Sequence, residues 1–330
     1  MISTVMVTDC TYQHLDYERA VLEPLGCTVI GQQCQTEQEV VERCAGAHAL
    51  LNQYAPLTRR VLSQLPDCKM VVRYGVGYDS VDVEAASDYG IMVVNVPDYG
   101  MQEVADHTLG LLLATIRKIP AIDADIRHGR WGDNPFHPIL GLQHKRVGLL
   151  GFGNIAREVA QRARAFNMQV MAYDPFVAAD VFARHQVESA SWQQVLSQAD
   201  VVCVHLPLMA ETRHFINAER LALMKPTAYL VNTARGGIIN GSDLADALTR
   251  GVIAGAGLDV FEQEPLPLDH PLRTAPNTVL TCHIAWYSED SLVRLQQYAA
   301  LEIARVVQGG WPKSVVNRAA LVAKGIMPAS

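Results

Sequence analysis

The 330-residue sequence predicts an α/β protein with two doubly wound domains and a cleft between them. Three observations predict this fold. Short apolar runs typical of buried strands alternate with helix-like segments, which favours parallel sheets covered by helices. The chain is long enough for two hydrophobic cores. A glycine-rich turn that opens a second series of strands stands in the middle of the chain and not near its beginning.

The first series of elements lies within residues 1–100. Short runs of Val, Ile, Leu, Met and Ala predict strands at 5–7, 28–30, 49–51, 70–72 and 91–94. Helices are expected at 17–25, 57–65 and 83–88. The turn at 96–100 contains Pro97 and Gly100, so we expect a hinge there.

The second series follows a long apolar helix expected at 103–119 and a loop expected at 127–144. Its predicted strands are 147–150, 169–173, 201–204, 228–231, 254–258 and 279–280. Its predicted helices include 157–166 and 243–249. A last helix at 291–307 is expected to cross back and complete the first domain, which would then be discontinuous.

The turn after the strand at 147–150 indicates a ligand. It reads Gly151-Phe152-Gly153-Asn154-Ile155-Ala156. The two glycines let the backbone approach a pyrophosphate, and the helix that follows aims free N–H groups and a partial positive charge at it. The small Ala156 allows close packing of helix and strand. This order of strand, turn and helix predicts a dinucleotide site.

Asp174 follows the next strand and predicts the identity of the dinucleotide. A carboxylate at this place accepts hydrogen bonds from the two hydroxyls of an adenine ribose. It also repels a 2′-phosphate, so we expect NAD and not NADP as the cofactor. The fold expected is therefore two Rossmann-like domains. Residues 103–284 would bind NAD, and residues 1–102 with 285–330 would bind the substrate.

Composition excludes several other classes of function. The net charge of −7 without a basic cluster does not favour nucleic acid or an anionic membrane as a partner. No membrane span or signal peptide is evident, because Asp9 interrupts the first apolar run. The seven cysteines form no CxxC pair, which is typical of reduced thiols in the cytoplasm. No pair of ligands has metal-binding spacing on a helix, so no metal is expected.

Reactive side chains follow four strands of the second series. Ligands bind beyond the carboxyl ends of the strands in an open α/β sheet, so these side chains should converge on the edge that holds the cofactor. They include His205, Arg235, Asp259, Glu264 and His283.

Three of these residues fit hydride transfer to a 2-oxo acid. Arg235 has a planar guanidinium that can bind both oxygens of the substrate carboxylate. His283 can protonate the ketone oxygen, because an imidazole has an ordinary pKa of about 6.5. Glu264, bonded to the other ring nitrogen, would orient the ring and favour its charged form.

Each of these residues also has an ordinary structural explanation. Histidines at strand ends are mostly satisfied structural groups, arginines in glycine-rich loops are mostly surface charges, and Glu264 stands in an acidic turn before Pro265. The remaining histidines singled out in the sequence are interpreted as structural only. They are His107, His128, His137 and His144.

Taken in order, the motifs resemble those of the D-2-hydroxyacid dehydrogenase family over nearly the whole chain. This family includes phosphoglycerate dehydrogenase, glyoxylate/hydroxypyruvate reductase, formate dehydrogenase and the C-terminal binding proteins. The segments that carry the resemblance are Arg73-Tyr74-Gly75-Val76-Gly77-Tyr78-Asp79, Val104-Ala105-Asp106-His107-Thr108, the glycine motif with Asp174, His205-Leu206-Pro207-Leu208, Asn232-Thr233-Ala234-Arg235-Gly236-Gly237, Asp259-Val260-Phe261, Glu264-Pro265 and His283.

The resemblance implies an NAD-dependent oxidoreductase that interconverts a 2-oxo acid and a D-2-hydroxy acid, with Arg235, Glu264 and His283 as catalytic residues. It implies that the backbone of Gly75, Val76 and Gly77 holds the substrate carboxylate. It also implies a homodimer formed through the nucleotide-binding domain. The cofactor contacts that it implies are Thr108, Gly151, Gly153, Asn154, Ile155, Asp174, Pro207, Thr212, Thr233, Ala234, Asp259 and His283.

Departures from the family patterns bear on the substrate. Phosphoglycerate dehydrogenases carry a phosphate-binding arginine just after the strand at 49–51, where this chain has Asn52-Gln53-Tyr54, and we expect no regulatory domain after residue 330. An unphosphorylated substrate is therefore expected, although Arg73 could still contribute a charge. Formate dehydrogenases have glutamine in place of Glu264, so the glutamate argues against that activity.

The segment after His283 resembles the C-terminal binding protein branch, in which a tryptophan borders the substrate. It reads Ile284-Ala285-Trp286-Tyr287-Ser288-Glu289. The Trp286 indole either packs on an apolar substrate tail or fills the interface between the domains, and the sequence leaves both interpretations open.

The leading hypothesis is an enzyme that acts on glyoxylate, hydroxypyruvate or a larger 2-oxo acid. One alternative is an NAD(H)-responsive, dimeric partner-binding protein that resembles the C-terminal binding proteins, which keep the catalytic residues. Another is a phosphoglycerate dehydrogenase.

Overall fold

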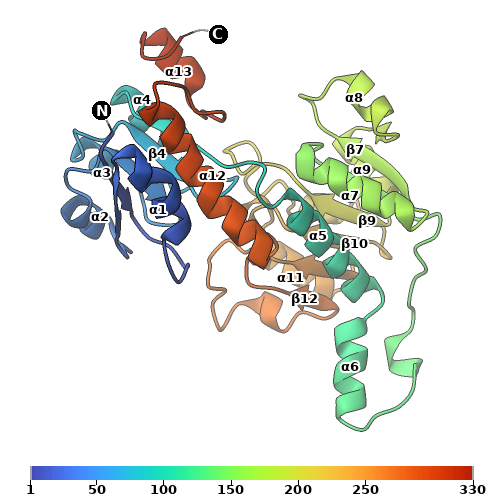
Figure 1. The fold of residues 1–330 in the computed structure, drawn as a ribbon. Helices are drawn as coiled ribbons and strands as arrows, with labels where there is room; N and C mark the ends of the chain where they lie inside the picture. The colour runs from blue at the N-terminus through green and yellow to red at the C-terminus, as the bar shows by residue number, and fades with distance from the viewer. Residues whose placement is uncertain (1, 329–330) are drawn as a thin grey trace. The chain divides into compact units, whose positions relative to one another are not determined.

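The computed structural model describes residues 2–328 and divides into two compact units. The N-terminal unit consists of Met1–Gly100 with Ser288–Ser330, and the nucleotide-binding unit consists of Met101–Tyr287. Each unit is built on its own parallel sheet, with helices on both faces (Figure 1). The predicted α/β class with two Rossmann-like units is confirmed.

The sheet of the N-terminal unit has five parallel strands in the order β2-β1-β3-β4-β5. Their bounds are Thr4–Val7 for β1, Thr28–Gly31 for β2, Ala49–Asn52 for β3, Met70–Arg73 for β4 and Met92–Val94 for β5. One face packs on α2 (Glu37–Arg43), α3 (Arg59–Ser63) and α4 (Val83–Asp88), with Leu50 and Val71 fully buried in the shared core.

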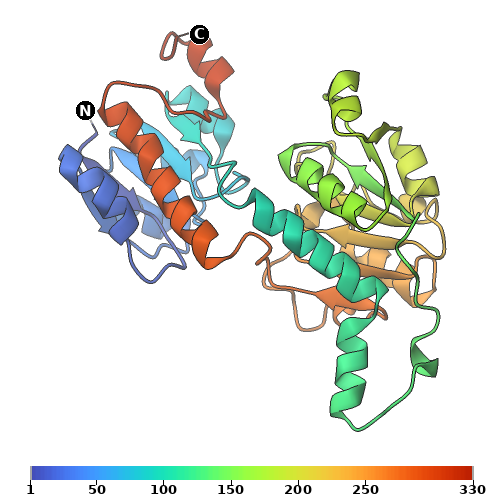
Figure 2. The same cartoon turned by 45° about the vertical axis from the view of Figure 1, so that its right-hand side comes forward.

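The C-terminal segment completes this unit. Helix α12 (Glu289–Val307) lies beside α1 (Asp16–Leu22), as both ribbon views show (Figures 1 and 2). The amide of Gln296 on α12 donates to both carboxylate oxygens of Glu18 on α1 at 3.1 Å, and Tyr74 donates to the same carboxylate at 2.7 Å. These buried bonds hold the helix in place. A short helix, α13 (Arg318–Ala323), follows it.

The sheet of the nucleotide-binding unit has seven parallel strands in the order β12-β11-β10-β9-β6-β7-β8. Their bounds are Arg146–Leu150 for β6, Gln169–Tyr173 for β7, Glu188–Ser189 for β8, Val201–Val204 for β9, Tyr229–Asn232 for β10, Gly255–Leu258 for β11 and Thr278–Leu280 for β12. The chain runs from β6 outward to β8 and then returns to β9 on the other side of β6. This reversal at β6 and β9 is a topological switch point, and open α/β sheets bind ligands at such a point, beyond the carboxyl ends of the strands.

Alternating side chains of the strands fill two cores, one on each face of this sheet. Helices α5 (Met101–Ile116) and α7 (Asn154–Ala165) cover the face that carries Leu149 and Val231. Helices α9 (Trp192–Gln198), α10 (Ala218–Leu221) and α11 (Gly241–Thr249) cover the face that carries Leu150 and Leu230. Helix α8 (Ala179–Arg184) follows β7.

The structure corrects the helix that was predicted at 103–119. Helix α5 ends at Ile116, and α6 (Ile119–Arg127) starts after Lys118, whose φ of 54° is left-handed. None of the residues of α6 is buried, and the helix projects from the nucleotide-binding unit (Figure 2). The loop at 127–144 contains one short 3-10 turn, Asn134–Phe136. Helix α7 begins at Asn154, three residues earlier than predicted.

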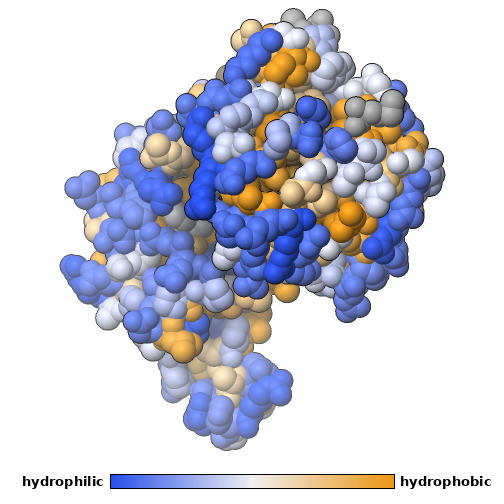
Figure 3. Space-filling model, turned by 90° about the vertical axis from the view of Figure 1, so that its left-hand side faces the viewer, coloured by the Kyte–Doolittle hydropathy of each residue, from blue (hydrophilic) through white to orange (hydrophobic). Residues whose placement is uncertain are grey.

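The surface seen in Figure 3 is mostly hydrophilic, with apolar side chains scattered over it in small groups. Within residues 2–328, no helix combines the length and the apolar character that a membrane crossing requires.

Candidate active site

The glycine turn follows β6 with the backbone geometry that a dinucleotide needs. Gly151 has a left-handed φ of 95°, and a Cβ there would lie 2.6 Å from the carbonyl oxygen of His205. A Cβ at Gly153 would meet no atom within 4 Å, so this glycine faces open space. No described side chain caps the N-terminus of α7, which Gly153 precedes. The open space and the free N–H groups fit the pyrophosphate of NAD.

Asp174 lies directly after β7 and organises the turn. One carboxylate oxygen accepts the backbone N–H of Phe152 at 2.9 Å, and the other accepts that of Phe176 at 3.0 Å. The charge is thereby fixed beside the glycine turn. Each oxygen keeps a lone pair, so the carboxylate retains acceptors for ribose hydroxyls.

His205 and the turn after it follow β9 and lie beside the glycine turn. The Nε2 atom of His205 is buried and has no hydrogen-bond partner among the described residues. Burial lowers the pKa of His205 to about 4, so the ring is neutral at neutral pH. The hydroxyl of Thr212 donates to the carbonyl of Pro207 at 2.5 Å and accepts the N–H of Met209 at 2.8 Å. The structure thus brings the predicted cofactor residues Pro207 and Thr212 together.

The loop after β10 carries Arg235 and is shaped by buried polar groups. The fully buried Asn232 accepts the N–H of Ala234 and donates to the carbonyl of Arg235, both at 3.0 Å. The hydroxyl of Thr233 lies 2.8 Å from the hydroxyl of Thr108, and Thr108 donates to the carbonyl of Val104. Two predicted cofactor residues, Thr108 on α5 and Thr233, are therefore in contact. The guanidinium of Arg235 is half-buried and donates to the carbonyl of Ala234 at 2.7 Å.

His283 and Glu264 form the predicted pair. The Nδ1 atom of His283 lies 2.6 Å from Oε2 of Glu264, and Oε1 accepts the N–H of Phe261 at 2.9 Å. Burial alone would raise the pKa of Glu264. The hydrogen bond and charge of His283, the Phe261 N–H and the nearby charge of Arg235 outweigh burial and lower the pKa of Glu264. The carboxylate therefore stays ionised and holds its negative charge against the His283 ring.

Asp259 connects to the loop that carries His283. It is fully buried, and its carboxylate accepts the hydroxyl of Thr281 at 2.6 Å and the N–H groups of Ile284 and Ala285 at 3.0 and 2.9 Å. His107 on α5 lies 3.0 Å from the hydroxyl of Thr281. A direct contact of Asp259 with the cofactor stays a prediction.

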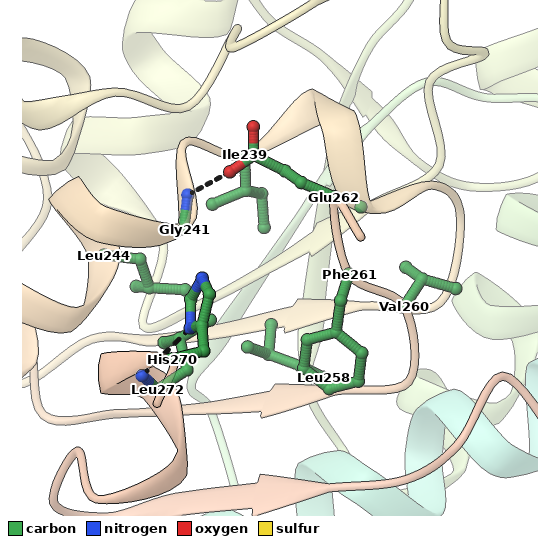
Figure 4. Close-up of a pocket in the computed structure, with 10 residues that line it drawn as sticks. Ile239, Gly241, Leu244, Leu258, Val260, Phe261, Glu262, His270 and Leu272 are labelled. Carbon is green, nitrogen blue, oxygen red and sulfur yellow. Dashed lines mark hydrogen bonds between the residues drawn. The ribbon is translucent and has the colours of Figure 1, made fainter. Parts of the chain in front are cut away.

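A second histidine–glutamate pair lies next to the first. Glu262, on the same turn as Glu264, pairs with Nε2 of His214 and accepts the N–H of Gly241 at 2.9 Å. Figure 4 shows the Glu262 carboxylate reaching the N-terminus of α11 at the edge of a small pocket that Phe261 and His270 line. Both carboxylate oxygens of Glu262 thus bind the protein, which gives this pair a structural role.

Trp286 lies close to the reactive loop. Its indole N–H donates to the carbonyl of His283 at 3.1 Å, and its ring meets that of Tyr287 edge to face at 5.5 Å. The indole is thereby held against the backbone of the proposed acid–base residue. Its contact with a substrate stays a prediction.

The predicted carboxylate-binding loop lies in the N-terminal unit, after β4. Gly75 has a φ of 134°, and a Cβ at this position would lie 1.7 Å from a guanidinium nitrogen of Arg73. The carbonyl of Val76 accepts the amide of Asn95 at 2.6 Å, and Val76 is 37% exposed. Gly77 completes this short loop. Glycine at position 75 thus lets a cation approach the loop closely.

Sequence reasoning missed the contact of His107 and Thr281 with the site. The sequence alone favours a structural role for His107 and gives no signal at Thr281. One signal was available, because His107 stands beside Thr108 in a motif that carries the family resemblance. In residues 2–328, no three His, Cys, Asp or Glu side chains gather as metal ligands would.

Comparison with known proteins places these residues in a family. The family model described as "D-isomer specific 2-hydroxyacid dehydrogenase, NAD binding domain" matches residues 109–285. A glyoxylate reductase of Thermofilum pendens is 40% identical over 266 residues, which are 79% of this chain and 78% of that protein.

Two further proteins are similar to this chain. A D-3-phosphoglycerate dehydrogenase of Methanocaldococcus jannaschii is 39% identical over 86% of this chain, which spans only 54% of that longer protein. The structure of a D-lactate dehydrogenase of Aquifex aeolicus, complexed with NAD and lactic acid, has a TM-score of 0.84 and 26% identity, and covers 99% of this chain and 100% of its own.

Proposed function

Because the chain belongs to the D-isomer specific 2-hydroxyacid dehydrogenase family, we propose that it reduces an unphosphorylated 2-oxo acid to the D-2-hydroxy acid. The protein is an NAD-dependent oxidoreductase that interconverts 2-oxo and 2-hydroxy acids. Glyoxylate, hydroxypyruvate and larger 2-oxo acids are the substrates that we propose to test. The observation that supports the reaction most directly is the 2.6 Å contact between His283 and Glu264.

We assign the proton transfer to His283. Its Nδ1 is bound to Glu264, which leaves Nε2 to donate a proton to the ketone oxygen as negative charge develops there. Bound NADH would supply the hydride. In the reverse direction, neutral His283 accepts the hydroxyl proton through the same nitrogen. Glu264 stabilises the imidazolium that exists before reduction and after oxidation.

We assign substrate orientation to Arg235. Its fork of N–H groups matches the two oxygens of a carboxylate, and its loop is fixed by the buried Asn232. In the N-terminal unit, Gly75, Val76 and Gly77 remain the proposed substrate-binding loop. For the cofactor, we propose the glycine turn, Asp174 and the paired Thr108 and Thr233 as binding elements.

The end of β3 supports an unphosphorylated substrate. The side chains of Asn52 and Gln53 are neutral and buried, and both are engaged inside the unit, Asn52 with Thr8 and Gln53 with Thr11. Tyr54 brings no charge. The guanidinium of Arg73 lies 6.0 Å from the centre of the Tyr54 ring and is one cation that a phosphate could meet here, whereas a dianion is usually bound by several donors.

We also propose that the protein is a cytoplasmic homodimer. All seven cysteines are free thiols, as is typical of a reducing compartment. Helix α6 buries no residue, while Ile119 and Ile126 on it and Trp131 after it are 54%, 46% and 92% exposed. Apolar groups of this size on a projecting helix favour an interface with a second copy. Light scattering of Ile126→Lys against the wild type tests this, and a monomeric wild type would overturn it.

A screen of NADH oxidation against a panel of 2-oxo acids tests the proposed function. We expect the highest kcat/KM on an unphosphorylated acid and a large loss in Arg235→Ala. Higher kcat/KM on phosphohydroxypyruvate would favour the phosphoglycerate dehydrogenase alternative. Tight NADH binding without turnover of any acid would favour the partner-binding alternative. Wild-type kcat/KM in Arg235→Ala would overturn the role of that residue.

A further inference from the structure

The backbone of His283 has a conformation that its own side chain does not favour. Its φ of 56° lies in the left-handed region, and this costs an ordinary residue about 1 kcal/mol or more. Such a conformation persists only where surrounding contacts impose it. The contacts that hold this loop are therefore part of what places the imidazole.

Asp259 supplies most of these contacts from the end of β11. Its backbone carbonyl accepts the N–H of His283 at 2.7 Å. Its carboxylate binds the hydroxyl of Thr281, two residues before His283, and the N–H groups of Ile284 and Ala285, which follow it. One buried side chain thus clamps the loop on both sides of His283. This carboxylate must itself be fixed, because its bonds to Thr281, Ile284 and Ala285 depend on its orientation.

The protons on the neighbouring groups show which residue fixes the Asp259 carboxylate. A carboxylate only accepts hydrogen bonds, so the single proton of the Thr281 hydroxyl lies in the 2.6 Å contact with Asp259. The same hydroxyl oxygen lies 3.0 Å from Nε2 of His107, and it can only accept in that contact. His107 must therefore carry a proton on Nε2. The result is a directed chain of hydrogen bonds from α5 through Thr281 to Asp259.

The Nε2 atom of His107 also lies 3.6 Å from Oδ1 of Asp259, so the proton faces the carboxylate charge as well. The side chain of His107 is 26% exposed and that of Asp259 is 1% exposed. A hydrogen bond between such partly dehydrated groups is stronger than one in water. This series of hydrogen bonds thus links helix α5 to the loop that carries His283.

We propose that His107 and Thr281 are positioning residues, which act through Asp259 to hold the His283 imidazole in line with the reacting oxygen. This inference rests on the proposed role of His283 as the acid–base residue. Neither side chain needs to touch the substrate. Small displacements at the reacting atoms have large effects on rate. Loss of these hydrogen bonds should therefore slow proton transfer while cofactor binding is retained.

A matched pair of variants tests Thr281. Valine has nearly the shape of threonine without the hydroxyl, while serine keeps the hydroxyl. We expect Thr281→Val to lower kcat about 10- to 100-fold and Thr281→Ser to stay near the wild type. The dissociation constant of NADH, measured by fluorescence, should be unchanged in both. The solvent deuterium isotope effect on kcat should rise in Thr281→Val only, because a misplaced acid makes proton transfer more rate-limiting.

A second pair tests His107. Glutamine can place an amide N–H near the position of Nε2, while leucine cannot donate. We expect His107→Leu to reproduce the lower kcat and larger isotope effect of Thr281→Val, and His107→Gln to restore much of the rate. If Thr281→Val does not fold, this pair decides the question.

The outcomes separate this inference from the proposed function. A Thr281→Val enzyme with the kcat and isotope effect of Thr281→Ser would overturn the positioning role. A loss of kcat without a change in isotope effect would also overturn it, since it would indicate less active protein. His283→Ala serves as the reference: wild-type turnover in that variant would refute the proposed function itself, whatever Thr281 does.

Discussion

The Nδ1 atom of His283 lies 2.6 Å from Oε2 of Glu264, although the two residues follow different strands of the sheet. The other oxygen of Glu264 is held by the N–H of Phe261, so the carboxylate cannot turn freely. The ring is thereby oriented with Nε2 directed away from the pair. This geometry assigns the two ring nitrogens different tasks, one for orientation and one for proton transfer.

Glu264→Gln should lower the kcat for reduction by about 100-fold or more, because an amide does not stabilise the imidazolium that donates the proton. The lowered pKa of Glu264 keeps the carboxylate ionised throughout the neutral range. The wild type should therefore lose the activity that depends on Glu264 only in acid, below the ordinary pKa of a glutamate, where Glu264 takes up a proton. In the variant this acid limb should be absent, because glutamine does not titrate. The pH profiles of kcat check this.

Glu262→Gln is the matched control, since Glu262 stands on the same turn and also pairs with a histidine. Its partners, His214 and the N–H of Gly241, hold the turn and not the reactive ring. We expect its pH profile to overlay that of the wild type. Loss of the acid limb in both variants would mean that the whole turn, and not Glu264, governs the profile.

Arg235→Lys should lower kcat/KM by about 10- to 150-fold, although it preserves the positive charge. A lysine makes one directed contact where the guanidinium makes two, and a charge-assisted hydrogen bond contributes about 1.5–3 kcal/mol. Steady-state kinetics with the best 2-oxo acid check the loss, and the affinity for NADH should not change. Arg250→Lys, directly after α11, is the control, because that side chain is 69% exposed and pairs with Asp246. Near wild-type kcat/KM in Arg235→Lys would refute bidentate binding.

Asp174→Asn should weaken the preference for NADH over NADPH. In the wild type, a 2′-phosphate would face the carboxylate, and at about 4 Å this repulsion amounts to several kcal/mol at most near a protein surface. We expect the ratio of kcat/KM values for the two cofactors to fall at least about tenfold in the variant, since about 1.4 kcal/mol corresponds to that factor. Asp180→Asn, an exposed site on α8, should leave the ratio unchanged. Better turnover of NADPH by the wild type would contradict the role of Asp174.

Local patterns in the sequence predicted most of the fold and much of the site. Buried parallel strands are short apolar runs, and the glycine turn has a backbone that only glycine adopts easily, as at Gly151. The break between α5 and α6 also has a signal in the sequence. Pro120 lies in the first turn of α6, and proline is common in the first turn of a helix but not in its interior.

The rest of the site depends on contacts between distant parts of the chain. His107 and Thr281 are 174 residues apart, and no spacing in the sequence connects them. The burial of Asp259 follows from the packing of β11 and from the loop that wraps its carboxylate. The left-handed backbone of His283 could not be predicted either, because histidine adopts a positive φ more often than most residues but still rarely.

His205→Leu should make the stability of the protein less sensitive to acid. Burial lowers the pKa of His205 in the folded protein from 6.5 to about 4, so below about pH 6.5 the unfolded chain binds a proton that the folded protein does not. Wild-type stability should therefore be greatest above that pH and fall as the pH drops toward 4, by up to about 3 kcal/mol from this residue.

Urea unfolding midpoints at about pH 7 and about pH 4.5 measure the loss in each protein. His128→Gln, at an exposed site, should lose as much as the wild type, because it keeps the buried His205. If His205→Leu loses as much stability as the wild type between the two pH values, the imidazole is not held neutral by burial.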